Sequence, residues 1–163
     1  MEKQDLPRSR APTLPYVAEM DKTADRIVIK VGTNTLTDQK GVIDRAYLAS
    51  LAEQIAELRR MGADVLLVTS GAIRAGMELM RLVQRPKTIP EKQAAAAVGQ
   101  GFLMQVYTDV FRRYDITIGQ VLLTRDDFGE RRRYLNARNT MLELFRHGIV
   151  PVVNENDTVA VDE

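Results

Sequence analysis

Three groups of residues in this 163-residue chain carry side chains suited to small-molecule chemistry. Lys30 ends a short apolar run and can direct a compact positive charge at a phosphate group. Ser70 and Gly71 follow a second apolar run, where a hydroxyl and a close backbone approach suit a bound anion. Asn154 and Asp157 follow a third run, and their polar atoms can hold an amino group or a cation. The pattern indicates a binding site for a small charged molecule.

Each group also has a structural explanation that the sequence leaves open. Lys30 can be an edge lysine whose ammonium reaches water. Ser70 can be an ordinary helix N-cap. Asn154 and Asp157 can belong to a solvated turn, because both residue types favour turns.

The elements that would position these residues are four short apolar strands. We predict strands over Arg26–Val31, Asp64–Val68, Ile116–Leu123 and Ile149–Val153, each leading into a polar or glycine-bearing tip. Their apolar residues leave no polar face, which is typical of a parallel sheet covered on both sides. We therefore expect an α/β fold, a three-layer αβα sandwich with a mainly parallel central sheet. Ligands of such sheets bind beyond the carboxyl ends of the strands, where the three groups lie.

Helix signals separate the predicted strands. Asp44 is a candidate N-cap for an amphipathic helix that ends before Gly62. A second helix should start after Gly71, with Met80 and Val83 on its apolar face. Thr88 and Glu91 have the spacing of a capping box, which predicts a long helix to about residue 113. A last helix is expected over residues 134–147, after three arginines that we interpret as a solvated loop or a helix start.

Small residues dominate the segment Gln93–Gly101 of the predicted long helix. Gly99 and Gly101 imitate the start of a dinucleotide-binding fingerprint, but Met104 stands where the third glycine would be and no strand precedes the segment. Glycine lowers helix stability, so packing must offset its presence. We interpret the small residues as permitting the close approach of another element.

Composition excludes several kinds of function. There is no cysteine and one histidine, which rules out disulfides, thiolate metal sites and histidine clusters. A formal net charge of +1 gives no sign of a nucleic-acid partner. No apolar run is long enough to cross a membrane and no signal peptide is visible, so we expect a cytoplasmic protein. Residues 1–25, with three prolines and no periodic pattern, are expected to form a flexible N-terminal extension.

Taken together, six segments resemble the amino acid kinase family, and within it the kinases that phosphorylate glutamate. The segments, in the order of the family, are residues 28–33 (VIKVGT), 68–73 (VTSGAI), 92–100 (KQAAAAVGQ), 122–127 (LLTRDD), 134–140 (YLNARNT) and 152–160 (VVNENDTVA). The resemblance extends from residue 26 to the end of the chain. It implies ATP-dependent phosphorylation of the side-chain carboxylate of L-glutamate to γ-glutamyl phosphate, the first step toward proline.

The resemblance also implies residue roles. Lys30 would match the catalytic lysine at the transferring phosphoryl group, with Gly32 and Thr33 beside it at the phosphates of ATP. The substrate would be held by Ser70, Gly71, Ala72, Asn154 and Asp157. Mg²⁺ would be held mainly through the nucleotide, so we expect no residue of this chain to form a metal site.

The chain departs from the family in length. Family members continue into a nucleotide-binding half that is absent here, so residues 26–163 are expected to be the N-terminal, substrate-side part of a truncated kinase domain, inactive alone. The alternatives are a non-catalytic module that binds glutamate or proline, and a half that needs a complementary chain. A homo-oligomer and feedback inhibition by proline are further expectations from the resemblance.

Overall fold

The computed structural model describes residues 26–38 and 41–160, and the predicted extension over residues 1–25 lies outside them. Four parallel strands form one sheet in the spatial order β1-β2-β4-β3. The strands are β1 Arg26–Lys30, β2 Asp64–Val68, β3 Ile118–Leu123 and β4 Val150–Glu155. The parallel sheet predicted from the two-sided apolar runs is confirmed.

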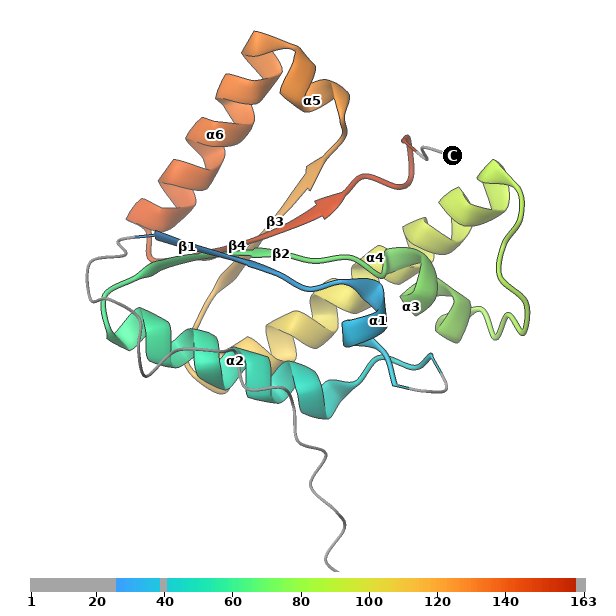
Figure 1. Ribbon diagram of the computed structural model, residues 1–163, viewed down its shortest axis with the longest axis horizontal. Coiled ribbons are helices and arrows are strands. Elements are labelled where there is room, and N and C mark those ends of the chain that lie inside the picture. The colour runs from blue at the N-terminus through green and yellow to red at the C-terminus, as the bar shows by residue number, and fades with distance from the viewer. Residues whose placement is uncertain (1–25, 39–40, 161–163) are drawn as a thin grey trace, which may run out of the picture.

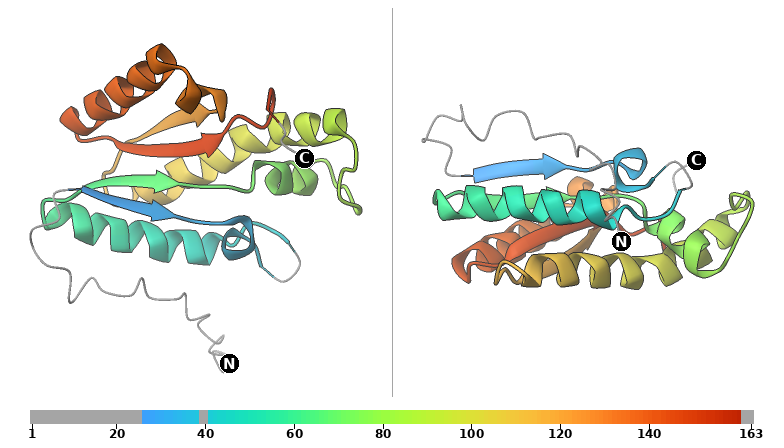
Figure 2. Two further views of the ribbon diagram at one scale, coloured as in Figure 1. Left: turned by 45° about the horizontal axis from the view of Figure 1, so that its top comes forward. Right: turned by 90° about the horizontal axis from the view of Figure 1, so that it is seen from below.

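Helices cover the two faces of the sheet in separate layers (Figure 1). The described helices are α1 Thr33–Leu36, α2 Arg45–Arg60, α3 Ala72–Leu79, α4 Ile89–Arg112, α5 Asp126–Gly129 and α6 Arg131–Arg146. Helices α2 and α4 lie side by side against one face, and α6 lies over the β3–β4 part of the other (Figures 1 and 2). This is the predicted three-layer α/β architecture.

The core lies between the sheet and the α2–α4 layer. Apolar residues of both helices pack under the inward-facing residues of the strands: Leu48, Leu51, Ile55, Leu103, Val106, Tyr107, Phe111, Val65, Leu67, Val150 and Val152. On the opposite face α6 buries no residue fully, and Val28 of the edge strand β1 is 63% exposed. One face of the sheet is therefore well covered and the other only partly covered.

The predicted caps are present. The Asp44 carboxylate accepts a hydrogen bond from the Tyr47 N–H and begins α2. Thr88 and Glu91 form a reciprocal capping box at the start of α4. The caps predicted where both helices begin, because a capping side chain accepts hydrogen bonds from backbone N–H groups that have no partner inside the helix.

Several boundaries differ from the sequence prediction. The short helix α1, which the sequence analysis did not predict, follows the exit of β1. Strand β4 continues through Asn154 and Glu155, which pair with Leu122 and Leu123 of β3. Helix α6 begins at residue 131, so the three arginines form its first turn. Helix α3 ends at residue 79, and Val83, predicted on its apolar face, is 98% exposed. Tertiary pairing and packing decide such ends.

The small residues of α4 allow α3 to pack very closely. A Cβ placed on Gly99 would lie 1.9 Å from the carbonyl oxygen of Ala72, and one on Gly76 would lie 1.8 Å from that of Ala95. No larger side chain fits at either position without moving a helix. The interpretation of the segment as a close-packing surface is confirmed, and its effect is to hold the first turn of α3 in place.

The described residues contain no helix long and apolar enough to cross a membrane.

Candidate functional site at the carboxyl edge of the sheet

The register of the sheet brings three of the strand ends together. Lys30 at the end of β1 is the partner of Val68, which is in turn the partner of Val153. The Thr69 N–H continues this ladder by donating to the Val153 carbonyl over 2.8 Å. The residues that follow β1, β2 and β4 therefore meet at one edge.

An open cavity of about 970 Å³ lies at this edge. Six residues singled out from the sequence line it: Lys30, Gly32, Thr33, Ser70, Gly71 and Asp157. Three separate segments of the chain supply them, the exits of β1, β2 and β4. The cavity thus brings together residues as far apart in the chain as Lys30 and Asp157, which are separated by 127 positions.

Hydroxyl groups join the exits of β1 and β2. Thr33 Oγ1 and Ser70 Oγ share a hydrogen bond of 2.7 Å. Below them, Thr69 Oγ1 shares a buried hydrogen bond of 2.7 Å with the Tyr107 hydroxyl of α4. The Tyr107–Thr69 contact anchors the β2 exit to the core, and the Thr33–Ser70 contact fixes the two loops relative to each other.

Gly71 begins α3 in a conformation that favours glycine. Its φ is 96°, in the left-handed region, and a Cβ there would lie 2.9 Å from Leu36 Cδ2. Gly71 is the N-cap residue and no described side chain caps the helix, so the alternative of Ser70 as a capping serine is not what the structure has. The backbone N–H groups at the start of α3 are left to bind an anion.

Two of the singled-out residues do not line the cavity. Ala72 is 1% exposed and lies in the tight contact between α3 and α4. Asn154 is 4% exposed, and its Nδ2 donates to Gln100 Oε1 of α4 over 2.7 Å. In this structure the Asn154 amide therefore faces the helix layer rather than the cavity.

Asp157 is the acidic side chain that lines the cavity among the described residues. Partial burial, with a smaller contribution from the negative charge of Glu155, raises the pKa of the Asp157 carboxyl to about 6. A carboxylate that loses hydration in this way is ready to accept a positively charged partner. The partner would restore the lost solvation and lower the pKa again.

Two arginines that the sequence analysis did not select also line the cavity. Arg74 is the third residue of α3 and Arg85 lies in the loop before α4. With Lys30 they make three cations that line the cavity against one acidic residue, Asp157, so the site favours anions. One signal could have found Arg74: it stands three positions after Gly71, on the same face of a helix that begins at a strand exit.

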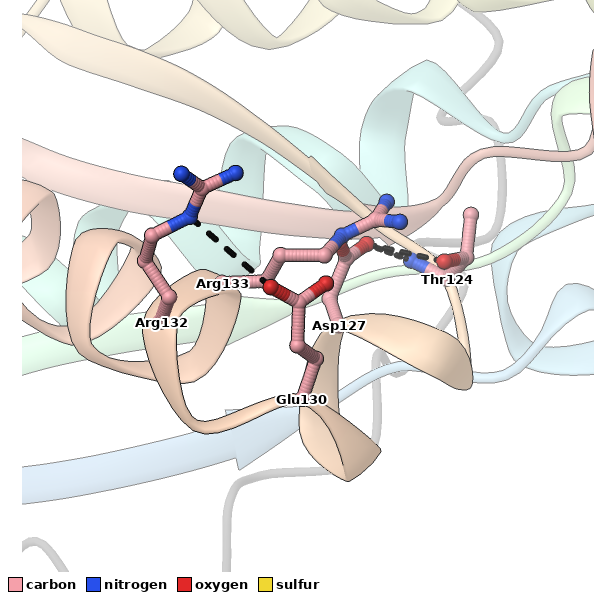
Figure 3. A network of polar contacts seen from close by, with 5 residues as sticks. All are labelled: Thr124, Asp127, Glu130, Arg132 and Arg133. Atoms are coloured by element: carbon pink, nitrogen blue, oxygen red, sulfur yellow. Dashed lines mark hydrogen bonds and ion pairs between the residues drawn. The ribbon is translucent and has the colours of Figure 1, made fainter.

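The exit of β3 is organised around Asp127 and does not line the cavity (Figure 3). The Asp127 carboxylate accepts hydrogen bonds from the Thr124 N–H and hydroxyl and from Arg133 Nε, over 2.5, 2.9 and 2.6 Å. These bonds, the one from the Thr124 N–H first, lower the pKa of Asp127. Arg132, in the first turn of α6, forms an ion pair with Glu130, the N-cap residue of that helix. This network connects β3 to α6.

Metal ligands are scarce in the part of the chain that the structure describes. It contains no group of three or more histidine, cysteine, aspartate or glutamate side chains that could hold a metal ion. A divalent cation at the cavity would therefore need ligands from a bound molecule in addition to Asp157.

Comparisons with known proteins give the chain its family. The model of the amino acid kinase family matches residues 25–163. The chain is 50% identical over 145 residues to a protein named glutamate 5-kinase from Geobacter sp. (strain M21), covering 89% of this chain and 39% of that relative. It is 53% identical over 138 residues to a glutamate 5-kinase from Thermoanaerobacter sp. (strain X514), covering 85% and 37%.

A shorter relative is covered more fully. The glutamate 5-kinase of Clostridium acetobutylicum is 50% identical over 139 residues, covering 85% of this chain and 52% of that relative. The solved structure of an aspartate kinase from Synechocystis aligns with 80% of this chain at a TM-score of 0.47 and 14% identity. The chain spans about two fifths of the length of the first relatives, and it belongs to the amino acid kinase family.

Proposed function

We propose that this chain forms the glutamate-binding portion of a glutamate 5-kinase, which transfers a phosphoryl group from ATP to the side-chain carboxylate of L-glutamate. The observation that carries the proposal is the cavity that brings Lys30, Ser70 and Asp157 together at the carboxyl edge of a parallel sheet. The names of relatives that are about half identical to the chain support the choice of substrate.

The proposed reaction fits the residues that are present. A carboxylate is ionised at neutral pH and needs no general base to become a nucleophile. Catalysis can then rest on alignment of the two reactants and on positive charge around the phosphoryl group. Lys30, exposed to the cavity at the end of β1, is the residue we assign to that charge. Its loss should slow phosphoryl transfer more than it weakens glutamate binding.

The ammonium group of glutamate is assigned to Asp157, which must be deprotonated to pair with it. Because the pKa of Asp157 in the free protein is raised to about 6, the carboxylate is available at neutral pH, and binding of the ammonium should weaken progressively as the pH falls below that value, since Asp157 must then release a proton first. Ser70 and the start of α3 offer a hydroxyl and backbone N–H groups for a carboxylate. Together these groups can bind the ammonium and a carboxylate of a small amino acid.

MgATP is part of the proposal, and when bound it supplies the phosphoryl group. The residues fit its phosphates. Lys30 supplies a positive charge to the cavity, and Gly32, at the start of α1, lets a phosphate approach the backbone there. A Cβ on Gly32 would lie 3.8 Å from Lys30 Nζ, so Gly32 keeps this part of the cavity free of a side chain. We assign the remaining nucleotide and Mg²⁺ contacts to residues outside this sequence.

A second candidate function is an amino-acid-binding module without catalysis. The observation that favours it is that Ser70, Gly71 and Asp157, which we assign to glutamate, line one cavity of this chain. Such a module would bind glutamate, or proline as a feedback inhibitor, without turnover. In this second proposal, a complementary chain would supply the catalytic activity. We also propose that the chain assembles as a homo-oligomer.

Calorimetric titration separates these functions. The 163-residue chain should bind L-glutamate in preference to D-glutamate and L-aspartate, and Lys30→Ala should leave this binding nearly unchanged. MgATP should bind more weakly than about 1 mM, the weak end of the affinity scale. Failure to bind L-glutamate would exclude the proposed function. Saturable MgATP binding below 1 mM, lost in Lys30→Ala, would place the nucleotide site within this chain.

A further inference from the structure

Arg74 is a cation of the cavity to which neither the family resemblance nor the proposed chemistry assigns a role. It is the third residue of α3, half-buried, and lines the cavity with Lys30 and Asp157. Helical side chains lean toward the N-terminus of their helix. The guanidinium of Arg74 is therefore carried back along α3 toward Gly71, the end of the helix that faces the cavity.

The guanidinium of Arg74 lies beside Gly41, in the loop before α2. A Cβ on Gly41 would lie 1.8 Å from Arg74 Nη2 and 2.4 Å from Arg74 Cζ. Gly41 also has a φ of 78°, in the region that favours glycine. Glycine at this position thus leaves room for the guanidinium of Arg74 beside the loop that precedes α2.

Arg74 makes no ion pair or hydrogen bond with the other residues of the described ranges 26–38 and 41–160. The acid one turn away, Glu78, accepts instead from the Ile43 N–H over 3.1 Å. A half-buried guanidinium with its donors unused is well suited to a planar anion, because it can offer two parallel N–H groups to a carboxylate.

The arrangement of charges indicates which carboxylate. In the proposed reaction the side-chain carboxylate of glutamate must lie near Lys30, and Asp157 takes the ammonium. The second carboxylate shares its carbon with the ammonium and needs a different cation. Arg74 and Arg85 are the other cations that line the cavity, and Arg85 is exposed in a loop whereas Arg74 is half-buried on α3.

We propose that Arg74 binds the α-carboxylate of glutamate and so makes the site specific for an amino acid with two carboxylates. This inference rests on the proposed function, because it assumes that L-glutamate occupies the cavity. It adds a specificity-determining residue on α3 to the roles already assigned at the strand exits.

The test pairs one substitution with two ligands that differ in one carboxylate. 4-Aminobutyrate keeps the amine and the distal carboxylate of glutamate but lacks the α-carboxylate. In the unmodified chain, calorimetry or NMR titration should show L-glutamate binding about 10- to 100-fold more tightly than 4-aminobutyrate, the scale of one charge-assisted contact. Arg74→Met should weaken L-glutamate binding by a similar factor and change 4-aminobutyrate binding less than about twofold.

Two further variants serve as controls. Arg74→Lys keeps the charge without the planar pair of donors, and should recover part of the affinity that Arg74→Met loses. Arg112→Met removes an exposed arginine at the far end of α4 and should leave both ligands unaffected. Thermal unfolding of each variant checks that the fold is retained.

The outcomes separate the inference from the proposed function. Glutamate binding that is unchanged in Arg74→Met, or an equal loss for both ligands, overturns the role of Arg74 and leaves the proposed function standing. A loss confined to MgATP binding would overturn it as well, since the guanidinium would then serve phosphate. An unmodified chain that binds no L-glutamate removes the basis of both.

Discussion

The hydroxyl groups of Thr33 and Ser70 lie 2.7 Å apart and share a hydrogen bond between the exits of β1 and β2. The two residues are 37 positions apart in the chain, and both line the cavity. The bond therefore couples the loop that we assign to phosphate with the loop that we assign to glutamate.

Removing the Ser70 hydroxyl should weaken glutamate binding. Ser70→Ala deletes both the contact with Thr33 and a donor to the ligand, so the dissociation constant should rise about 10-fold, the scale of one hydrogen bond. Thr33→Val is the matched control, since it breaks the same inter-loop bond while leaving the Ser70 hydroxyl in place. Equal losses in the two variants would show that Ser70 acts by holding the loops and not by contacting glutamate.

The two glycines Gly99 and Gly101 of α4 should respond to alanine in opposite directions. Gly99→Ala would place a Cβ 1.9 Å from the Ala72 carbonyl oxygen, so it should destabilise the protein by about 2–4 kcal/mol through overpacking. Gly101→Ala meets no atom within 4 Å and should stabilise the helix by about 0.5–1 kcal/mol.

Urea denaturation measures both changes. Because the Gly99 contact holds the first turn of α3, Gly99→Ala should also reduce glutamate affinity even where the protein remains folded, and Gly101→Ala should not. Similar stabilities for the two variants would mean that α3 and α4 are not packed as closely as described.

Asp157 should make the free protein more stable in acid than at neutral pH, other groups being equal. Its pKa is raised from the usual 3.8 to about 6, so the folded state binds a proton that the unfolded state has released between these values. Stability contributed by this group is present below pH 3.8 and is lost as the pH rises to about 6.

The variant Asp157→Asn isolates this effect. At pH 7.5 it should be more stable than the parent by about 1 kcal/mol, well below the full value of the shift because the carboxyl is half exposed and screened by water. At pH 4 the gain should disappear. Thermal unfolding at the two pH values is the measurement, and a gain of the same size at both would show that Asp157 is not the titrating group.

The buried amide pair of Asn154 and Gln100 should behave as a unit in stability. Asn154→Leu or Gln100→Leu alone leaves the other amide buried without a partner and should cost about 1–3 kcal/mol. The double variant should cost less than the sum of the two, because an apolar pair replaces both amides.

Glutamate binding by the same variants tests the assignment of Asn154 to the substrate. A larger loss of affinity in Asn154→Leu than in Gln100→Leu would support a direct contact that forms when the ligand binds. Equal losses would indicate that Asn154 acts by holding the β4 exit to α4. In either case Gln100 Nε2, buried without a partner among the described residues, is a donor that a rearranged Asn154 could satisfy.

Local patterns in the sequence were enough to predict the strands, the caps and the close-packing role of the small residues in α4. Each depends on neighbours in the chain: apolar runs bounded by glycine, Asp44 and Thr88 at helix starts, and the run of small residues in Gln93–Gly101. They also predicted Lys30, Ser70 and Asp157 at the cavity, because the carboxyl ends of parallel strands meet at one edge.

Tertiary structure decided what depends on contacts between distant segments. The Asn154–Gln100 pair spans 54 positions, and only the packing of α4 under β4 turns the Asn154 amide inward. Arg74 became a candidate ligand residue because Gly41, in another loop, leaves room for its guanidinium. Residue types and spacing set which elements form, whereas sheet register and helix packing set which side chains face the cavity, since those depend on close packing between segments far apart in the chain.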